Sequence, residues 1–395
     1  MVSRPIYLDH QATTPVDPRV LEAMLPWLGD WFGNPASRSH AYGWQAEAGV
    51  KTARTKLAAA INASPEEVIF TSGATEANNL AIKGVAEAYF SRGRHLITVQ
   101  TEHNAVLDPC RYLEGLGFRV TYLPVGPDGL LDLATLEAAF QPDTILVSVM
   151  AANNEIGVLQ PLAEIGARCR DRGVLFHSDG AQAIGKIPLD VQALPIDLLS
   201  LTAHKVYGPK GVGALYLRRR QPRVQLAAQI HGGGQERGWR SGTLAPHQIV
   251  GLATAVDLAL QDRTQEAERL AGLRDRLWTL LARQITLQRN GHAQHCLPGS
   301  LNVSIPGVDG AALLLGLRST VALSSGAACS SASTAPSHVL KALGHSDALA
   351  QASLRFGLGR FTTAAEIDTA AAAVVATVQA LTPPPGRESY SDSPA

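Results

Sequence analysis

Residues 174–205 read VLFHSDGAQAIGKIPLDVQALPIDLLSLTAHK, and this stretch decides the fold class. It holds two apolar, strand-like runs, Val174–His177 and Leu198–Leu201, and polar side chains follow each of them. The same alternation of short apolar runs and longer amphipathic stretches extends over residues 68–217. Repeated strand–helix alternation is typical of a mostly parallel sheet with helices on both faces. The sequence therefore predicts an α/β fold.

Further elements can be assigned around this stretch. Within residues 68–217, the other predicted strands are Val68–Phe70, Leu96–Val99, Arg119–Leu123 and Ile145–Val149. Its predicted helices are Glu76–Tyr89, Ala105–Leu116 and Leu162–Arg172. Downstream, the predicted helices are His247–Arg283, Ala311–Leu317 and Ala364–Leu381, and the predicted strands are Ser300–Ile305 and Ser353–Gly357.

The long helical pattern that begins at His247 is suited to connecting two domains. We expect a large domain over residues 15–255 and a smaller α+β domain built from residues 1–14 and 256–382. Residues 383–395 are rich in proline and serine and have little to bury, so we expect a disordered tail there.

Composition excludes several classes of function. Lysine plus arginine and aspartate plus glutamate number 34 each, so no net positive field favours a nucleic-acid partner. No apolar run approaches a membrane span, and the start lacks a secretory pattern, so we expect a cytoplasmic protein without a membrane partner. The four cysteines, Cys110, Cys169, Cys296 and Cys329, show no CxxC spacing, so we expect neither disulfides nor a resident metal site.

Lys205 is the strongest candidate for chemistry. It ends the motif SLTAHK (residues 200–205) just past an apolar strand, and the glycine-rich run GPKGVG (208–213) follows. Ligands of α/β sheets bind at the carboxyl ends of the strands. A lysine there can form a Schiff base with an aldehyde cofactor. Read alone, the motif equally fits a surface lysine at a strand end.

Asp179, in HSDGAQ (residues 177–182), favours the interpretation of Lys205 as a cofactor lysine over that of a surface lysine. It lies at the carboxyl end of the preceding predicted strand, where a carboxylate can pair with a protonated pyridine nitrogen. Gln182 is close enough to donate to the phenolate oxygen of the same ring. By itself Asp179 could instead cap the next helix. Together with Lys205 it favours a cofactor site.

A phosphate needs a cradle, and TSGATE (residues 71–76) supplies one between a strand and a helix. Backbone N–H groups and the helix dipole favour an anion there, and Thr75 adds a hydroxyl. A plain helix cap is the alternative. His103 and Asn154 also follow predicted strands: His103 could stack on a planar ring and shuttle protons, and Asn154 could donate to a cofactor oxygen.

Taken together, these motifs resemble those of the cysteine desulfurases, and specifically the housekeeping group that serves iron–sulfur cluster assembly. The resemblance runs from IYLD (residues 6–9) and FGNPASRSH (32–40), through every motif above, to LRFGLGRFT (354–362). It implies the aspartate-aminotransferase type of fold, known as fold type I, and the cofactor pyridoxal 5'-phosphate (PLP).

The resemblance also assigns roles to individual residues. It makes Lys205 the Schiff-base lysine, Asp179 the pyridinium partner and His103 the ring-stacking acid/base. It places Gln182 and Asn154 on the phenolate side of the ring. Phosphate ligands by resemblance are Ala74, Thr75, Thr202, His204 and, lent by the second subunit of a homodimer, Thr243. Arg355 would clamp the α-carboxylate of the substrate L-cysteine, a role that suits a planar guanidinium.

Cys329 lies in SSGAACSSAS (residues 324–333), which is too small and polar to be core and reads as an exposed, mobile loop. The resemblance implies that its thiolate takes sulfur from cysteine, leaving L-alanine and a persulfide. The sulfur would pass to an iron–sulfur scaffold protein or to another acceptor, including those for tRNA thiolation, and Cys329 could transiently ligate a cluster. The other three cysteines are expected to be structural.

Two other interpretations stay open. The first is a different PLP reaction on the same scaffold, namely a selenocysteine or cysteine lyase or an aminotransferase, in which Cys329 would have no role. The second is a non-catalytic binding platform, against which the joint presence of Lys205, Asp179 and Arg355 argues.

Overall fold

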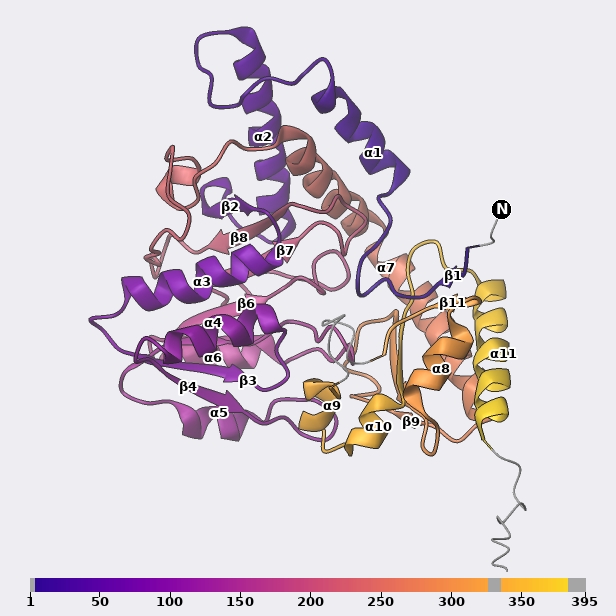
Figure 1. Ribbon diagram of the computed structural model, residues 1–395. Coiled ribbons are helices and arrows are strands. Elements are labelled where there is room, and N and C mark those ends of the chain that lie inside the picture. The colour runs from indigo at the N-terminus through magenta and orange to yellow at the C-terminus, as the bar shows by residue number, and fades with distance from the viewer. Residues whose placement is uncertain (1–3, 326–334, 383–395) are drawn as a thin grey trace, which may run out of the picture.

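The computed structural model describes residues 4–325 and 335–382. Its largest feature is a sheet that has, within these residues, seven strands in the order β2-β8-β7-β6-β5-β3-β4 (Figure 1). The strands are β2 (Val68–Thr71), β3 (His95–Val99), β4 (Arg119–Leu123), β5 (Thr144–Ser148), β6 (Leu175–Asp179), β7 (Leu198–Thr202) and β8 (Gly213–Leu217). Strand β8 pairs antiparallel with both β2 and β7, and the other described pairs in this sheet are parallel.

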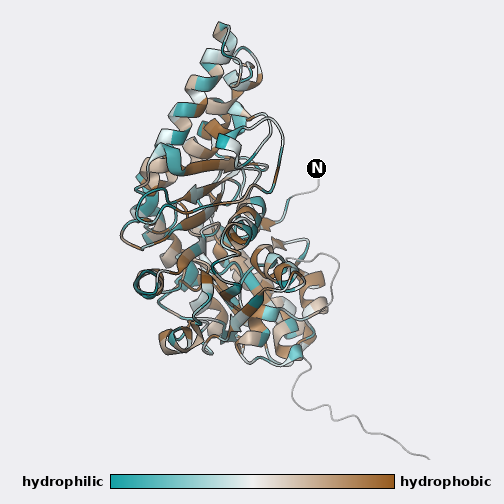
Figure 2. Cartoon of the chain, turned by 90° about the vertical axis from the view of Figure 1, so that its left-hand side faces the viewer, coloured by the Kyte–Doolittle hydropathy of each residue, from teal (hydrophilic) through white to brown (hydrophobic). Residues whose placement is uncertain are grey.

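Alternating side chains of these strands enter two different cores, one on each face of the sheet. Helices α1 (Pro18–Met24), α2 (Ala41–Ala60), α6 (Leu162–Asp171) and the start of α7 (Pro246–Ala282) cover one face. Helices α3 (Ala74–Ala88) and α4 (Asn104–Glu114) cover the other, and α5 (Leu133–Ala139) lies near α6 and β4. Burial on both faces explains the long apolar runs of the inner strands, which appear brown in Figure 2, whereas the edge strand β4 is only partly buried. The predicted α/β fold is confirmed.

A second core belongs to a smaller unit of the molecule. Its sheet has the order β12-β10-β9, formed by Ser353–Gly357, Ser300–Ser304 and Gln288–Arg289, with antiparallel pairing. Around it lie α8 (Gly310–Leu317), α9 (His338–Ala342), α10 (Asp347–Gln351) and α11 (Ala364–Leu381). Strand β1 (Ile6–Tyr7) pairs in parallel with β11 (Val321–Ala322), so the start of the chain joins this unit.

Helix α7 connects the two units, as its length predicts. Its residues Ile249 to Ala259 are buried in the core of the large sheet, and Leu270 to Leu281 are buried in the second core. Among the described helices, only α11 is long and apolar enough to cross a membrane by length and composition. Its Ile367, Val374 and Val378 pack into the second core, which accounts for that composition.

The predicted strands and helices are present, with ends that differ by a few residues, which is the usual uncertainty at helix and strand ends. Several described α-helices and strands were not predicted: α1, α2, α5 and β8 in the large unit, and β1, β9, β11, α9 and α10 in the smaller one. The alanine- and glycine-rich sequence of α2 carries little periodicity, and β8 follows the glycine-rich run. The predicted disordered tail, residues 383–395, lies outside the described residues.

Candidate active site

A cavity of about 540 Å³ opens at the carboxyl ends of β3, β5, β6 and β7. The structure brings nearly all of the predicted site residues to its wall. They are Ala74, Thr75, His103, Asn154, Asp179, Gln182, Thr202, His204, Lys205 and Arg355. Two predicted residues are not among them: Thr243 lines a separate cavity, and Cys329 lies outside the described residues.

Lys205 is held in a compact turn that follows β7. The N–H groups of Val206 and Gly208 both donate to the carbonyl oxygen of Ala203, each over 3.0 Å. Because these bonds fix the backbone on either side of Lys205, the lysine projects from a rigid support rather than from a free loop.

Asp179 ends β6 and is only 8% exposed. Its Oδ1 accepts the N–H of Ala181 over 2.8 Å, and its Oδ2 accepts the side-chain N–H of Asn78, on α3, over 2.7 Å. Hydrogen bonds to a carboxylate favour its charged form and fix its orientation. Asp179 is thus prepared to face a cation in the cavity, and Asn78, which sequence reasoning missed, is its support.

The predicted phosphate cradle is the N-terminus of α3. Gly73 has a φ of +151°, a backbone conformation that side chains rarely adopt. A Cβ on Gly213 would lie 2.7 Å from the Cα of Gly73, so glycine is needed where β8 passes the cradle. The bond from the Ser72 N–H to Glu76 closes the turn over 2.8 Å. The first N–H groups of this helix are thereby directed to the end of the cavity that Thr202 and His204 also line.

His103 is the N-cap residue of α4, and its Nδ1 accepts the N–H of Ala105 over 3.0 Å. In the neutral ring the proton is therefore on Nε2, so the ring has an N–H to donate. Burial, with the positive charge of Lys205, lowers the pKa of His103 below its ordinary value. The imidazole is neutral over a wider pH range as a result.

Glu102, next to His103, is a buried acid that sequence reasoning did not select. Its Oε1 accepts the N–H of Met150 over 2.6 Å, and its Oε2 has no partner among the described residues. Burial, with the charge of Asp179, raises the pKa of Glu102 well above its ordinary value. The protonated, neutral form of Glu102 is therefore favoured in the wall of the cavity.

Arg355 reaches the cavity from β12, in the second core, and is only 2% exposed. Its Nη2 donates to Asp9 over 2.8 Å, and its Nη1 donates to the carbonyl oxygen of Asn154 over 3.1 Å. Its Nε has no acceptor within the described part of the chain. The guanidinium is fixed in direction and keeps a donor for an anion.

Gln182 and His204 are also held in place. The side-chain N–H of Gln182 donates to the carbonyl oxygen of Gln11 over 2.8 Å, and its Oε1 accepts from Lys186 over 3.2 Å. Burial, with the charge of Lys205, lowers the pKa of Lys186 to about 7 and that of His204 to about 4. The lowered pKa values of Lys186 and His204 favour their neutral forms, which limits the number of positive charges around the cavity.

The cavity fits PLP in the chemistry of its walls. An amine, a carboxylate and a helix N-terminus are spread around one space, as an aldehyde, a ring nitrogen and a phosphate require. Buried polar atoms without partners in the described residues, Asn78 Oδ1, Gln11 Oε1 and Arg355 Nε among them, belong to lining residues. Such atoms are costly to leave unsatisfied and indicate that a polar ligand completes the site.

The described residues on either side of the segment that carries Cys329 are bonded to the cavity wall. On one side, the Ser324 hydroxyl donates to Asp9 over 3.0 Å, and Asp9 pairs with Arg355. On the other, the Ser337 hydroxyl donates to Glu155, and His338 Nε2 lies 2.9 Å from the carbonyl oxygen of Glu102. The described residues that flank positions 326–334 are thus bonded to Asp9, Glu155 and Glu102, beside the cavity.

The remaining cysteines are buried and, within residues 4–325 and 335–382, form no disulfide. Burial raises the pKa of Cys110 to about 12 and that of Cys169 even further. A thiol with so high a pKa is a poor nucleophile at neutral pH. This supports their interpretation as structural residues.

Comparison with known proteins places this site in a family. The sequence profile of the aminotransferase class-V family matches residues 6–369. A human cysteine desulfurase is 57% identical over 368 residues, covering 93% of this chain and 80% of the relative. Cysteine desulfurase IscS of Methylococcus capsulatus is 57% identical over 366 residues, covering 93% of this chain and 90% of the relative.

Solved structures give the same picture. A protein described as NifS-like superposes with a TM-score of 0.88 at 37% identity, covering 95% of this chain and all of that one. A structure described as SspA in complex with cysteine superposes with a TM-score of 0.81 at 38% identity, covering 91% of this chain and all of that one.

Proposed function

The chain belongs to the aminotransferase class-V family, and we propose that it is a PLP-dependent cysteine desulfurase that converts L-cysteine to L-alanine and collects the sulfur on Cys329. Relatives that are named for this activity are 55–58% identical to it over more than nine-tenths of its length. The observation that carries the proposal is the single cavity that joins Lys205 and Asp179, from one core, to Arg355, from the other.

Residues of the large sheet would hold the cofactor. When bound, PLP supplies an aldehyde for an amine and a ring that stores the electron pair released at the substrate's α-carbon. Lys205 provides the amine. Asp179 would pair with the ring nitrogen, and its two existing hydrogen bonds keep the carboxylate oriented for that contact.

The other cofactor contacts surround the ring and the phosphate. Ala74 and Thr75, at the N-terminus of α3, would bind the phosphate together with Thr202 and His204. Gln182 and Asn154 would face the phenolate oxygen, and Gln182 keeps a second side-chain N–H for it.

Substrate handling is divided between the two units. Arg355 would hold the α-carboxylate of cysteine, using the donor that its bonds to Asp9 and Asn154 leave open. Once the substrate amine has displaced it, Lys205 would take the α-proton. His103, with its proton on Nε2, would donate a hydrogen bond to a substrate thiolate. To accept the thiol proton itself, His103 would first have to release the Ala105 N–H from Nδ1.

Cys329 would complete the reaction as a nucleophile. Its thiolate attacks the substrate sulfur, a sulfur–sulfur bond forms, and the electrons of the broken carbon–sulfur bond pass to the substrate carbon, which is protonated to give alanine. The persulfide would then be passed to an iron–sulfur scaffold protein or another sulfur acceptor, including those for tRNA thiolation.

Mass spectrometry of the protein after incubation with L-cysteine, without reductant, tests this proposal. We expect a gain of sulfur that maps to Cys329 and is lost in Cys329→Ser, while Cys296→Ser retains it. Cofactor colour and its response to cysteine should survive in Cys329→Ser. Borohydride should fix the cofactor on Lys205. Full alanine turnover in Cys329→Ser would refute the role of Cys329 and favour a lyase or an aminotransferase.

A homodimer would supply the missing phosphate ligand. Thr243 lines a cavity of about 430 Å³ together with Asn34 and Pro35, away from Lys205. Close by in sequence, Phe32 and Trp44 are 68% and 56% exposed, and Figure 1 shows α1 and α2 projecting from the molecule in this region. Large exposed aromatic side chains are typical of an interaction surface. A second copy seated there would place Thr243 at its partner's site.

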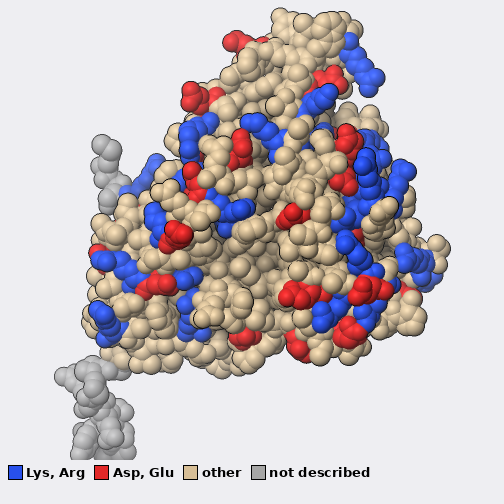
Figure 3. Space-filling view, turned by 180° about the vertical axis from the view of Figure 1, so that it is seen from behind, with Lys and Arg blue, Asp and Glu red and all other residues tan. Residues whose placement is uncertain are grey.

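Domain limits and cellular location follow from the same proposal. We assign residues 15–255 to a large cofactor domain and residues 1–14 and 256–382 to a small domain, because the two cores are separate and α7 joins them. Acidic and basic side chains are interspersed on the face seen in Figure 3, as expected if nucleic acid is not a direct partner. We place the protein in the cytoplasm.

A further inference from the structure

Lys205 and Arg355, the two groups that must grip opposite ends of one amino acid, are built on different cores. The turn of Lys205 is flanked by Ala203 and Val206, in the core of the large sheet. Arg355 lies between Leu354 and Phe356, in the second core. Their separation is therefore set by whatever fixes one core against the other, and not by either core alone.

Tyr207, at the end of the Lys205 turn, is one point at which the two cores are tied together, and it is the one next to the lysine. It is 5% exposed and has a φ of +65°, in the left-handed region that costs a residue other than glycine roughly 1–2 kcal/mol. Its N–H donates to the Thr14 hydroxyl over 2.8 Å, and its carbonyl oxygen accepts the N–H of Asp17 over 3.0 Å. An unfavourable backbone conformation persists only where surrounding contacts enforce it.

The N-terminal segment thus grips the turn on both sides of Lys205. The Thr14 hydroxyl that accepts from Tyr207 also donates to the carbonyl oxygen of His204 over 3.0 Å, and the Thr14 N–H donates to the same oxygen over 2.8 Å. These bonds leave the Tyr207 side chain directed toward the second core, where the closing segment of the chain meets it.

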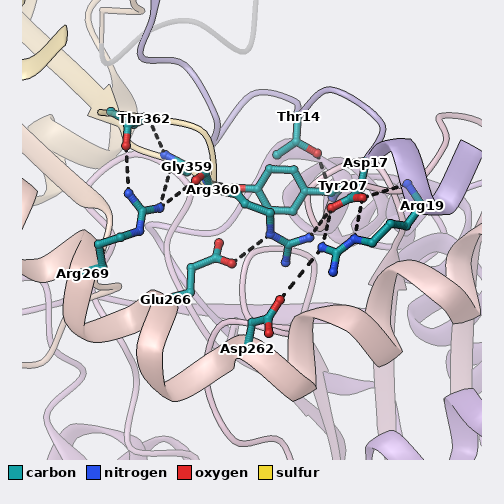
Figure 4. Close-up of polar contacts among 10 residues, drawn as sticks. All are labelled: Thr14, Asp17, Arg19, Tyr207, Asp262, Glu266, Arg269, Gly359, Arg360 and Thr362. Carbon is teal, nitrogen blue, oxygen red and sulfur yellow. Dashed lines mark hydrogen bonds and ion pairs between the residues drawn. The ribbon is translucent and has the colours of Figure 1, made fainter. Parts of the chain in front are cut away.

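Arg360, which follows β12 and Arg355 along the chain, completes the tie. Its backbone N–H donates to the Tyr207 hydroxyl, and its guanidinium lies 4.4 Å from the centre of the Tyr207 ring. The same guanidinium donates to Asp17 over 2.8 Å and to Glu266, on α7, over 2.9 Å. Figure 4 shows these contacts meeting around the Tyr207 ring. We call Tyr207, Arg360, Asp17 and Glu266 the Tyr207 latch.

Burial, hydrogen bonds and charge all stabilise the Tyr207 latch. Asp17 and Arg360 are 2% and 10% exposed in their side chains, and Arg269 adds bonds of 2.8 Å to the carbonyl oxygens of Arg360 and Thr362. Hydrogen bonds from Arg19 and Arg360 hold the pKa of the Asp17 carboxyl far below its usual range. The ion pair of Asp17 and Arg360 therefore persists at every pH at which the protein would be assayed.

We propose, on the basis of the proposed function, that Tyr207 is a positioning residue. The contact of its side chain with Arg360 fixes the distance between the small unit and the Lys205 turn. At that distance, one α-amino acid reaches both Lys205 and Arg355. Tyr207 itself does not line the cavity, so it acts through the two segments that it joins. The latch would thus determine the preference for a substrate with an α-carboxylate, and not the binding of the amine.

Equilibrium binding of two amines tests the latch. In a Cys329→Ser background, which blocks turnover, the absorbance of the bound cofactor reports dissociation constants for L-cysteine and for cysteamine, which lacks the carboxylate. We expect the parent to bind L-cysteine tighter by roughly 10- to 100-fold, the range of hydrogen bonds to charged groups. Tyr207→Phe should reduce this ratio by at least about fivefold, because the buried N–H of Arg360 loses its acceptor. The dissociation constant of cysteamine should stay unchanged.

Arg360→Lys replaces the two nitrogens that reach Asp17 and Glu266 by one and removes the guanidinium from the Tyr207 ring. It should reduce the ratio as well and provides a second variant if Tyr207→Phe does not fold. Tyr216→Phe, at an equally buried tyrosine on β8, is the matched control and should leave the ratio unchanged. In the apoprotein, amide hydrogen exchange in residues 353–362 should accelerate in Tyr207→Phe and not in Tyr216→Phe.

The outcomes separate the two claims. A parent ratio near one would overturn the role of Arg355, and with it the purpose of the latch. A high parent ratio that survives in both folded latch variants would overturn the latch alone. An equal loss of affinity for both amines would show general damage at Lys205 and would also refute the positioning role.

Discussion

Exchanging the side chains of Asp179 and Asn78 separates what Asp179 does for the fold from what it does for catalysis. Asp179 accepts two hydrogen bonds, from the Ala181 N–H over 2.8 Å and from Asn78 over 2.7 Å. In Asp179→Asn, the new amide has only one acceptor oxygen, so its N–H₂ group must face one of these two donors. In Asn78→Asp, two buried carboxylates face each other. The double variant restores one donor and one acceptor.

The structure sets the size of these effects. Asp179→Asn loses a hydrogen bond to a charged group and buries a donor against a donor, which should cost about 1.5–3 kcal/mol of apoprotein stability. Asn78→Asp should cost a similar amount through like-charge repulsion at a buried site. We expect the double variant to recover most of this loss, with a coupling energy of about 1–3 kcal/mol.

Activity should not recover with stability. The exchange moves the carboxylate from β6 to α3, away from the position at which we propose it pairs with the ring nitrogen. Alanine formation should stay reduced by on the order of 100-fold or more in both Asp179→Asn and the double variant, which is the scale for removing one preorganised electrostatic partner.

Urea unfolding of the four apoproteins, with alanine release by the holoproteins, measures both effects. A double variant no more stable than either single variant would refute the hydrogen-bonded pair described here. A double variant with near parental activity would refute the requirement for a carboxylate at position 179.

Three further predictions follow from other groups in the site. Burial raises the pKa of Glu155 from 4.5 to about 7, so between these pH values the folded state binds a proton that the unfolded state does not. The free energy of unfolding should therefore fall by about 3 kcal/mol as pH rises from 4.5 to 7. Glu155→Gln should lack this pH dependence in urea unfolding. Burial raises the pKa of Glu102 well above its ordinary value and so favours the neutral acid, which accepts a backbone N–H. Glu102→Gln should therefore unfold like the parent, whereas Glu102→Ala should lose about 1–3 kcal/mol; equal losses would contradict the neutral form. Mixed dimers of one Lys205→Ala subunit and one Thr243→Ala subunit should regain activity that neither variant homodimer has. One of their two sites then combines an intact Lys205 with an intact Thr243 from the other subunit. If activity does not recover, Thr243 belongs to its own subunit's site.

How far the site could be predicted differs from residue to residue. Lys205, Asp179 and His103 each follow a predicted strand directly, and the carboxyl ends of parallel strands share one edge of the sheet. Their convergence is therefore a consequence of the alternation in the sequence. Arg355 was assigned by resemblance alone, because nothing in its local pattern indicates which edge of the large sheet β12 approaches.

The residues that sequence reasoning missed are those that support the site. Asn78 is a polar residue on the buried face of α3, and that break in an apolar pattern is a signal that could have been used. Lys186 and Glu102 offered no such signal, because a lysine after a glycine or a glutamate before a histidine is ordinary in a surface loop. Their burial beside Lys205 and Asp179 gives them their shifted pKa values.

Periodicity and short motifs, which act locally, were enough to predict the α/β fold, most strands of its large sheet and the edge of the sheet where chemistry occurs. The partner of each side chain became known from the folded arrangement alone. Asp17 and Arg360, at opposite ends of the chain, pair beside Tyr207, where Asp17 donates to the Tyr207 carbonyl and Arg360 to its hydroxyl, because two separate cores pack against the Lys205 turn. Contacts of that kind depend on how packed units dock, and no local pattern of residues encodes that geometry.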